Sequence, residues 1–387
     1  MSTSKKSLFF RFVLWIVTSL IGALAMGFLL IYWATGGAVQ PFAQFIRGYL
    51  VIRRDFYQSV PEKTLFHGAI SGMVSSLHDP YSKVLAGDKY TAFLRQTTGE
   101  YSGIGIALGE AADGQSMILS VFPESPAEAS GLQPGDLIQQ INGRDVSGLT
   151  MEDIAGRVRG KPSTSLTVTI LRNGTSKTYE ISRSTITLPT VQSFMAAKNI
   201  GYVRIFQFGF HTPEEIRKSL ASLRQKGMEK LIIDLRKNPG GLIDSVVEVA
   251  NQLLSKGTVV SYHEKNGHVH SYTISGADTL LPMVIMVDRD SASASEILAG
   301  AAQDKGEAVI MGETSFGKGT VQSVVPFGDQ AAIKISIAEY KTPKGRSINH
   351  IGIVPDIPVD QTGTAFNRAD DSVYDTAIQY LNEQGRM

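Results

Sequence analysis

Two short segments of this chain carry side chains that could do chemistry together. Residues 291–297 read SASASEI and offer three serines at the start of an expected helix. Residues 314–322 read TSFGKGTVQ, with Lys318 between two glycines and Gln322 four residues later. The chain contains no cysteine, so a thiol nucleophile is excluded. This combination is typical of a serine hydrolase whose general base is lysine rather than histidine.

A serine at a helix start can hold its hydroxyl near backbone N–H groups that lack partners inside the helix. The helix dipole favours negative charge that develops there during a reaction. Small neighbouring residues leave room for a peptide to approach. The competing interpretation is a helix cap of serine and alanine without chemistry. The residues alone do not choose among Ser291, Ser293 and Ser295.

Lys318 can act as a base only if its amine is neutral at the working pH. An ordinary lysine, with a pKa of ~10.4, is protonated near neutrality. Burial away from carboxylates lowers the pKa of lysine, and residues 314–325 contain no acidic side chain. A surface turn is the alternative for a lysine between glycines. The sequence GKGT also suggests a phosphate loop, but the glycine spacing does not fit one, so nucleotide binding is not expected.

A glycine pair follows the apolar run at residues 231–235, in the sequence NPGG of residues 238–241. Glycines at a strand end can aim backbone N–H groups into a cleft. With the N–H of Ala294, Gly240 and Gly241 would then form an oxyanion hole. A plain turn between a strand and a helix is the alternative, and this sequence would make it equally well.

Composition excludes several other classes of function. The formal net charge of +1 gives nucleic-acid binding no electrostatic support. The absence of cysteine rules out disulfides and thiolate metal sites. His268 and His270 stand at alternate positions, as zinc ligands can, but no carboxylate or thiol completes a ligand set in the sequence pattern. We therefore expect neither a metal nor an organic cofactor.

The amino-terminal segment bears on location. Residues 12–33 carry no charge over 22 positions, close to the ~20 needed to cross a membrane. Lys5, Lys6 and Arg11 precede this segment, and the next charge after it is Arg47. The positive-inside rule then predicts a cytoplasmic tip and an extracytoplasmic chain. A cleavable signal peptide is the alternative, although its apolar region is usually shorter.

The hydrophobic pattern changes three times along the chain. Residues 37–98 show helical spacing, and residues 99–185 read as short strands with a helix at 151–158, a pattern typical of a small barrel-like module. From residue 199 onward apolar strands alternate with helices, which predicts an α/β fold with a largely parallel sheet. A polar tail over 362–371 precedes a final helix at 372–383.

In this order and spacing, the motifs resemble those of the carboxyl-terminal processing peptidases, serine proteases with an embedded PDZ domain. The resemblance covers about residues 55–360 and includes the two segments described first. The other matching motifs are LFHGAISGM at 65–73, SGIGI at 102–106, SPA at 125–127, GLQPGD at 131–136, DLRKNPGG at 234–241, YKTP at 340–343 and GIVPD at 352–356.

The resemblance assigns roles to several of these residues. It implies that Ser293 is the nucleophile, that Lys318 is the base and that the Gln322 amide orients Lys318. It implies a crotonase/ClpP-like α/β protease domain with an inserted PDZ domain. The segment made of Ser102, Gly103, Ile104, Gly105 and Ile106 resembles the carboxylate-binding loop of PDZ domains, with the helix at 151–158 completing an apolar pocket. Such a pocket binds proteins or peptides with apolar carboxyl termini.

We predict five regions: a cytoplasmic tip and transmembrane anchor (1–34), a helical region (35–98), a PDZ domain (99–185), a serine protease domain (186–361) and a tail with a helix (362–387). The predicted protein is a serine endopeptidase anchored by residues 12–33 in a bacterial cell membrane, with its catalytic domain on the periplasmic side. Two alternatives remain, a catalytically inactive PDZ scaffold and an enzyme like the acyl-CoA hydratases. A homo-oligomer and an adaptor protein are left open.

Overall fold

The computed structural model describes residues 3–34, 36–98, 100–111, 114–265, 267–328, 330–362, 366 and 370–383. Residues 1 and 2 of the predicted tip and 384–387 of the predicted tail lie outside the described residues. The chain divides into two compact units, Met1–Ser76 and Leu77–Met387.

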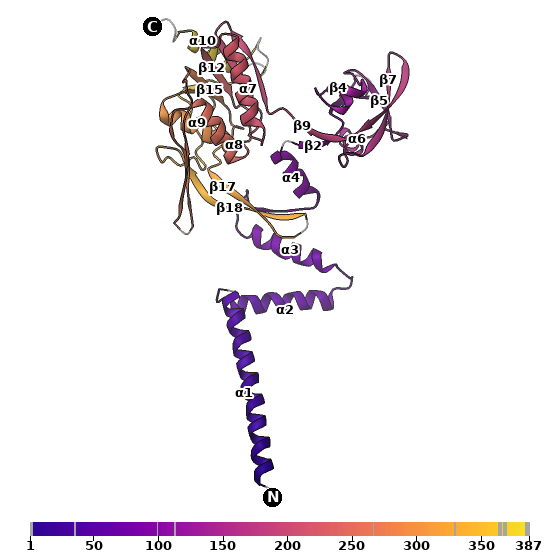
Figure 1. Cartoon of the computed structure of the whole chain (residues 1–387), viewed down its shortest axis with the longest axis vertical. Coiled ribbons are helices and arrows are strands. Elements are labelled where there is room, and N and C mark those ends of the chain that lie inside the picture. The colour runs from indigo at the N-terminus through magenta and orange to yellow at the C-terminus, as the bar shows by residue number, and fades with distance from the viewer. Residues whose placement is uncertain are drawn as a thin grey trace. The chain divides into compact units, whose positions relative to one another are not determined.

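The first unit consists of the helices α1 (Thr3–Ala34), α2 (Val39–Asp55) and α3 (Glu62–Ser75) (Figure 1). Within α1, the segment Leu14–Trp33 is 20 residues long and apolar, and none of it is buried. It is long and apolar enough to cross a membrane, a condition that a signal sequence also meets. Arg53 and Glu62, whose side chains are 3.3 Å apart, link α2 to α3.

A six-stranded sheet forms the centre of the second unit. Its order is β10 (Val191–Ala197), β11 (Ile200–Ile205), β12 (Lys230–Asp234), β15 (Met283–Val287), β16 (Val309–Gly312) and β19 (Ile357–Pro358). Only the pairing of β10 with β11 is antiparallel. Strands such as β15 are buried along their whole length. The continuous apolar runs of the sequence therefore fit a parallel sheet covered on both faces, as predicted.

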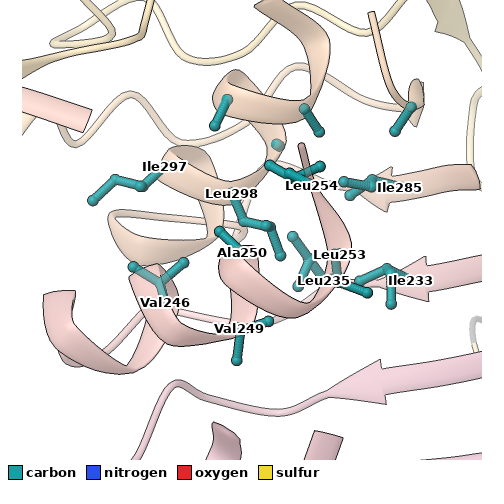
Figure 2. Close-up of a cluster of buried hydrophobic side chains, with 14 of the residues drawn as sticks. Ile233, Leu235, Val246, Val249, Ala250, Leu253, Leu254, Ile285, Ile297 and Leu298 are labelled. Carbon is teal, nitrogen blue, oxygen red and sulfur yellow. The ribbon is translucent and has the colours of Figure 1, made fainter. Parts of the chain in front are cut away.

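Helices cover the two faces of this sheet. Three of them, α7 (Thr212–Gln225), α8 (Ile243–Leu253) and α9 (Ala294–Lys305), share one hydrophobic cluster with alternate residues of β11, β12 and β15. The helix α10 (Ser372–Glu383) packs on the opposite face through Val373 and Leu381. Figure 2 shows side chains of α8 and α9, including Val246 and Leu298, against Ile233 and Ile285 of the sheet. This packing holds the amino end of α9 in place, where the predicted nucleophile lies.

A second sheet lies against α8 and α9. Its long strand β18 (Ala331–Lys341) pairs with β1 (Lys83–Ala86), β13 (Gly257–Glu264) and β17 (Thr320–Pro326), and β13 pairs with β14 (Val269–Ile274). The sequence pattern predicts helices within residues 37–98 and does not indicate a strand at residues 83–86. They form β1 because β18 offers them a strand edge, a partner that local sequence does not reveal.

The predicted barrel-like module has a hydrophobic core of its own, which includes Ile118, Ile154 and Val168. Its strands are β3 (Ile106–Glu110), β4 (Ser116–Val121), β5 (Leu137–Ile141), β6 (Arg144–Asp145), β7 (Ser165–Arg172) and β8 (Thr175–Ser182), with helices α5 (Pro126–Ser130) and α6 (Met151–Val158). Strands β2 (Glu100–Gly103) and β9 (Ser184–Thr187) pair with each other where the chain enters and leaves the module. Helix α4 (Asp88–Thr98) precedes β2.

The segment around Asp371 joins the core of the second unit. Asp371 is only 1% exposed, and its carboxylate accepts two hydrogen bonds from the Arg236 guanidinium, at 2.8 and 2.9 Å. The same guanidinium binds Asp234 at the end of β12. The polar character of 362–371 suggested a tail, but Asp371 is a buried partner of the sheet and fixes the start of α10.

Candidate active site

The three serines of residues 291–295 have different environments. Ser291 Oγ donates to the carbonyl of Leu235 (2.8 Å) and accepts from the amide of Asp288 (2.9 Å). Ser295 Oγ donates to the carbonyl of Asn238 (3.0 Å). Both are fully buried, and neither borders the cleft that Ser293 lines. Ser291 and Ser295 thus tie α9 to the end of β12, and Ser293 is the serine that a substrate can reach.

Ser293 stands immediately before α9 with an unusual backbone conformation, φ 56° and ψ −113°. A residue with a side chain pays about 1–3 kcal/mol for such a conformation, which persists where surrounding contacts enforce it. One of these contacts is with Gly240. A Cβ added at position 240 would lie 2.8 Å from Ser293 Cβ and 2.6 Å from the carbonyl oxygen of Ala292, too close for a side chain. Glycine at 240 therefore permits the close approach that presents Ser293 to the cleft.

Lys318 lines the same cleft, in the loop between β16 and β17. Burial lowers the pKa of its amine, opposed by the charge of Glu296 and assisted by that of Lys83. The Nζ atom lies 5.0 Å from the centre of the Tyr81 ring. No hydrogen bond or ion pair of Lys318 Nζ occurs among the described residues, and Lys318 shares the cleft with Ser293. Hydrogen bonds between nucleophile and base often form only with substrate bound.

Glu296, whose role was not foreseen from the sequence, connects these two residues. Its carboxylate is fully buried and accepts hydrogen bonds from the amides of Ser293 (2.7 Å), Gly317 (2.7 Å) and Lys318 (3.0 Å). It also accepts one from Ser315 Oγ (2.7 Å). Glu296 is thus a positioning residue that holds the Lys318 loop against the start of α9. A serine followed three residues later by glutamate is a capping-box pattern, so the sequence did contain a signal for this contact.

Tyr340 of β18 makes a second link that was not foreseen. Its buried hydroxyl contacts the backbone carbonyls of both Ser293 (3.1 Å) and Lys318. Burial raises the pKa of this phenol well above its usual value, so the hydroxyl stays protonated and can donate. Glu296 and Tyr340 together fix both catalytic candidates through their backbones.

Replacing Glu296 by glutamine should lower kcat by about 10–100-fold and also reduce stability, by about 1.5–3 kcal/mol for the lost charge-assisted hydrogen bonds. The amide would turn one acceptor oxygen into a donor that faces other donors. Peptide hydrolysis and urea unfolding measure the two effects. Glu307→Gln is the matched control, because Glu307 accepts from the amide of Ser255 (2.7 Å) outside the cleft. An equal loss of kcat in both variants would contradict the positioning role.

The predicted oxyanion residues also meet in this place. Gly240, Gly241 and Ser293 line the cleft, and Ala294 N lies 2.8 Å from where a Cβ of Gly240 would be. The amide of Gly240 already donates to Asn238 Oδ1 (2.9 Å). Ala294 is the first residue of α9, where an N–H has no partner inside the helix. Gly241 and Phe208 form an isolated parallel bridge. In this bridge the amide of Phe208 donates to the carbonyl of Gly240, and the amide of Leu242 donates to the carbonyl of Phe208. The amide of Gly241 takes no part in the bridge.

Gln322 lies on β17 and lines the cleft as well. Its Nε2 group donates to the backbone carbonyl (2.9 Å) and hydroxyl (2.8 Å) of Thr320, which holds the amide plane. No hydrogen bond joins Gln322 to Lys318 among the described residues. The orienting role of Gln322 therefore stays a prediction.

The cleft has a volume of about 430 Å³. Its lining comes from β1, β17 and β18 of the second sheet, from α4, α8 and α9, from the glycine turn and from the loops that hold Phe208 and Lys318. Besides the residues already placed there, it includes Lys83, Phe93, Gln207, Phe208, Leu242, Ile243, Val324 and Lys334. A cleft of this size and mixed polarity suits an extended peptide.

A second pocket of about 440 Å³ lies in the barrel-like module. All five residues of the predicted carboxylate-binding loop, from Ser102 to Ile106, line it together with Met151, Ala155 and Val158 of α6. The structure therefore brings the loop and the helix together at one pocket. Arg159, which follows α6, is a basic residue at the same pocket.

The histidines considered as metal ligands lie elsewhere. His270 Nε2 is 3.0 Å from Glu264 Oε1, a carboxylate that the sequence pattern did not reveal, and the His268 ring packs edge-on against His270. Within the described residues there is no group of three or more side chains able to hold a metal ion.

Comparison with known proteins agrees with this geometry. The family model of peptidase family S41 matches residues 199–359, a PDZ model matches 117–172, and a model of the N-terminal domain of the activating protease CtpB matches 34–89. The chain is 36% identical to a carboxyl-terminal-processing protease of Picosynechococcus sp. over 350 residues, which cover 88% of this chain and 82% of the relative. The chain belongs to peptidase family S41.

Two further relatives extend the comparison. The carboxy-terminal processing protease CtpB of Bacillus subtilis is 38% identical over 81% of this chain and 67% of its own length. The solved structure of a photosystem II D1 C-terminal processing protease is 29% identical and superposes with a TM-score of 0.50, over 83% of this chain and 87% of that one. The S41 member described here is thus a carboxyl-terminal processing peptidase with a PDZ domain.

Proposed function

We propose that this S41 peptidase cleaves peptide bonds by a Ser–Lys mechanism. The observation that carries the proposal is that Ser293 and Lys318 line one cleft while Ser291 and Ser295 are consumed by structural hydrogen bonds. Neutral Lys318 takes the proton of Ser293 Oγ as that oxygen attacks the carbonyl carbon, and returns it to the departing amine. Water then releases the acyl group from Ser293 by the same route.

The negative oxygen of the tetrahedral intermediate needs donors that are in place before the reaction. We assign this task to the amides of Ala294 and Gly241, with Gly240 providing the close approach between the glycine turn and α9. Gln322 would align Lys318 through its free amide oxygen. The order of layers, with helices between two sheets and α10 outside, supports a crotonase/ClpP-like classification of the protease domain.

In this proposal the PDZ pocket selects substrates by their carboxyl termini. Backbone amides of the loop at 102–106 would bind the terminal carboxylate, and the apolar walls formed by Ile106, Met151 and Val158 would take an apolar last side chain.

The helix Leu14–Trp33 would hold the protein in the cell membrane with the catalytic domain on the extracytoplasmic side. Proteolytic shaving of spheroplasts distinguishes this topology from a secreted form with a cleaved leader.

Ala155→Glu should test the selection step, because it places a carboxylate in the pocket that would receive the substrate's own carboxylate. We expect hydrolysis of an unfolded protein with an apolar carboxyl terminus to fall by about tenfold, since like charges and a lost apolar wall oppose binding. Ala129→Glu, on the exposed side of α5 outside the pocket, is the matched control. Equal rates for the two variants would exclude this pocket as the recognition site.

A further inference from the structure

We propose that Lys83 and Lys334 form a basic subsite of the active-site cleft, which binds a carboxylate of the substrate near the scissile bond. This inference rests on the proposed Ser293–Lys318 function, because it specifies which substrates that cleft prefers. Neither lysine transfers a proton in the chemistry described above, although the charge of Lys83 helps to lower the pKa of Lys318.

The two lysines are neighbours across the second sheet. Lys83 of β1 lies opposite Lys334 of β18, and Lys334 in turn lies opposite Val324 of β17. All three residues line the cleft, so this cross-strand row faces it. The adjacent row pairs Gln322 with Ser336. Because rows on one face are two residues apart, the lysine row lies roughly 7 Å farther along the strands than Gln322.

The charge of this part of the cleft is not balanced by the protein. The ionisable lysine and carboxyl side chains that line the cleft, within the described part of the chain, are Lys83, Lys318 and Lys334, without an aspartate or glutamate. Asp79 does not line the cleft, but its charge raises the pKa of both Lys318 and Lys334. Its carboxylate already accepts hydrogen bonds from the amide of Tyr81 (3.1 Å) and from the hydroxyl of Ser82. With Lys318 neutral, Lys83 and Lys334 give this end of the cleft a positive potential.

Lys334 is in addition poorly solvated. Burial, followed by the charges of Lys318 and Lys83, lowers the pKa of Lys334 to about 8, and its Nζ lies 5.7 Å from the centre of the Phe93 ring. Near neutral pH most Lys334 side chains still carry a proton. A half-buried ammonium without a carboxylate partner gains a charge-assisted hydrogen bond when a substrate supplies one.

The carboxylate could come from two sources on a polypeptide. One is an aspartate or glutamate side chain within a few residues of the cleaved bond. The other is the terminal carboxylate of a chain that ends inside the cleft. Both present the same group to Lys83 and Lys334, and peptides can separate them.

The experiment uses the full-length protein and a set of peptides that share one cleavage site. In a neutral parent peptide, each glutamine near the site is replaced in turn by glutamate, and each peptide is made with a free and with an amidated carboxyl terminus. We expect glutamate at one position, or the free carboxyl terminus, to raise kcat/KM about tenfold over the neutral peptide. In the double variant Lys83→Met/Lys334→Met this acidic-to-neutral ratio of kcat/KM should fall to about one. It should persist in the control Lys89→Met, which changes an exposed lysine of α4 outside the cleft.

The single variant Lys83→Glu guards against loss of folding, because Lys83 is exposed and needs no burial of a new charge. It should reverse the preference from glutamate to lysine at the same position. A change in the pKa of Lys318 in these variants would alter kcat/KM by the same factor for every peptide. It would therefore cancel in the ratio of kcat/KM between acidic and neutral peptides. An acidic-to-neutral ratio that is equal in the parent and double variant would overturn the subsite.

Binding of the same peptides to the Ser293→Ala protein separates this inference from the proposed function. If the parent protein cleaves no peptide, the Ser–Lys function fails. The subsite still stands if acidic peptides bind Ser293→Ala about tenfold more tightly than neutral ones and the added Lys83→Met/Lys334→Met substitutions abolish that difference. Equal binding of acidic and neutral peptides would refute the subsite alone.

Discussion

Ser293→Ala should reduce peptide hydrolysis by at least about 10⁴-fold while leaving the fold intact. Removal of a serine nucleophile costs about this much or more, because the oxyanion donors and substrate binding that remain supply only a small part of the acceleration. The rate of cleavage of an unfolded protein substrate, with the thermal unfolding of each variant, measures the effect. A fluorophosphonate probe should label the parent protein and fail to label Ser293→Ala.

The neighbouring serines provide matched controls. Ser295→Ala loses one buried hydrogen bond to the Asn238 carbonyl and should be about 1 kcal/mol less stable. It should keep activity within about tenfold of the parent, and so should Ser291→Ala if it folds. Hydrolysis by Ser293→Ala at a rate comparable to the parent would show that the nucleophile lies elsewhere.

Lys318→Arg should be as inactive as Lys318→Ala, with losses of about 10³-fold or more. A guanidinium stays protonated at any working pH and cannot accept the Ser293 proton, although it preserves a positive charge. Lys237→Arg is the matched control, because Lys237 is half exposed and forms an ion pair with Asp290 at the surface. Activity of Lys318→Arg within about tenfold of the parent would mean that the residue acts only as a charge.

The pH profile provides a second measure of the same base. Burial lowers the pKa of Lys318, so the neutral, active amine is present above that lowered pKa and is lost by protonation as the pH falls through it. We expect kcat/KM to rise with pH and level off below the ordinary lysine range near 10.4. Lys83 contributes to the lowering, so Lys83→Met should move the rise to higher pH. A profile that is flat across the neutral and alkaline range would argue against a lysine base.

Much of the fold was accessible from local pattern. The apolar run at 283–287 is strand β15, the helix at 151–158 is α6 and the helix at 372–383 is α10, each with the expected bounds. These segments have strong apolar periodicity or clear caps; for instance, Thr150 accepts from the amide of Asp153 (3.2 Å) at the start of α6. Strand β1 was not accessible, because its pairing with β18 links residues about 250 positions apart.

For the site, residue types and spacing were enough to identify a serine at a helix start, a lysine between glycines and a glycine pair after a strand. Family resemblance then selected Ser293. These features are local, since each depends on a residue's own conformation or that of its neighbours. No local feature, however, shows whether a serine is reachable or whether a lysine is buried.

Only the tertiary structure decided those points. Ser291 and Ser295 are excluded because their hydroxyls donate to the carbonyls of Leu235 and Asn238 in the segment that follows β12, which is another part of the chain. Lys318 has a lowered pKa because the packing of β17, β18 and the segment around Tyr81 removes it from water. Glu296 and Tyr340 join the start of α9 to the Lys318 loop through contacts that span 22 and 47 residues. Burial and hydrogen bonding between distant segments arise from the packing of whole layers. Local sequence patterns do not show which distant segments meet, so these contacts could not be predicted from them.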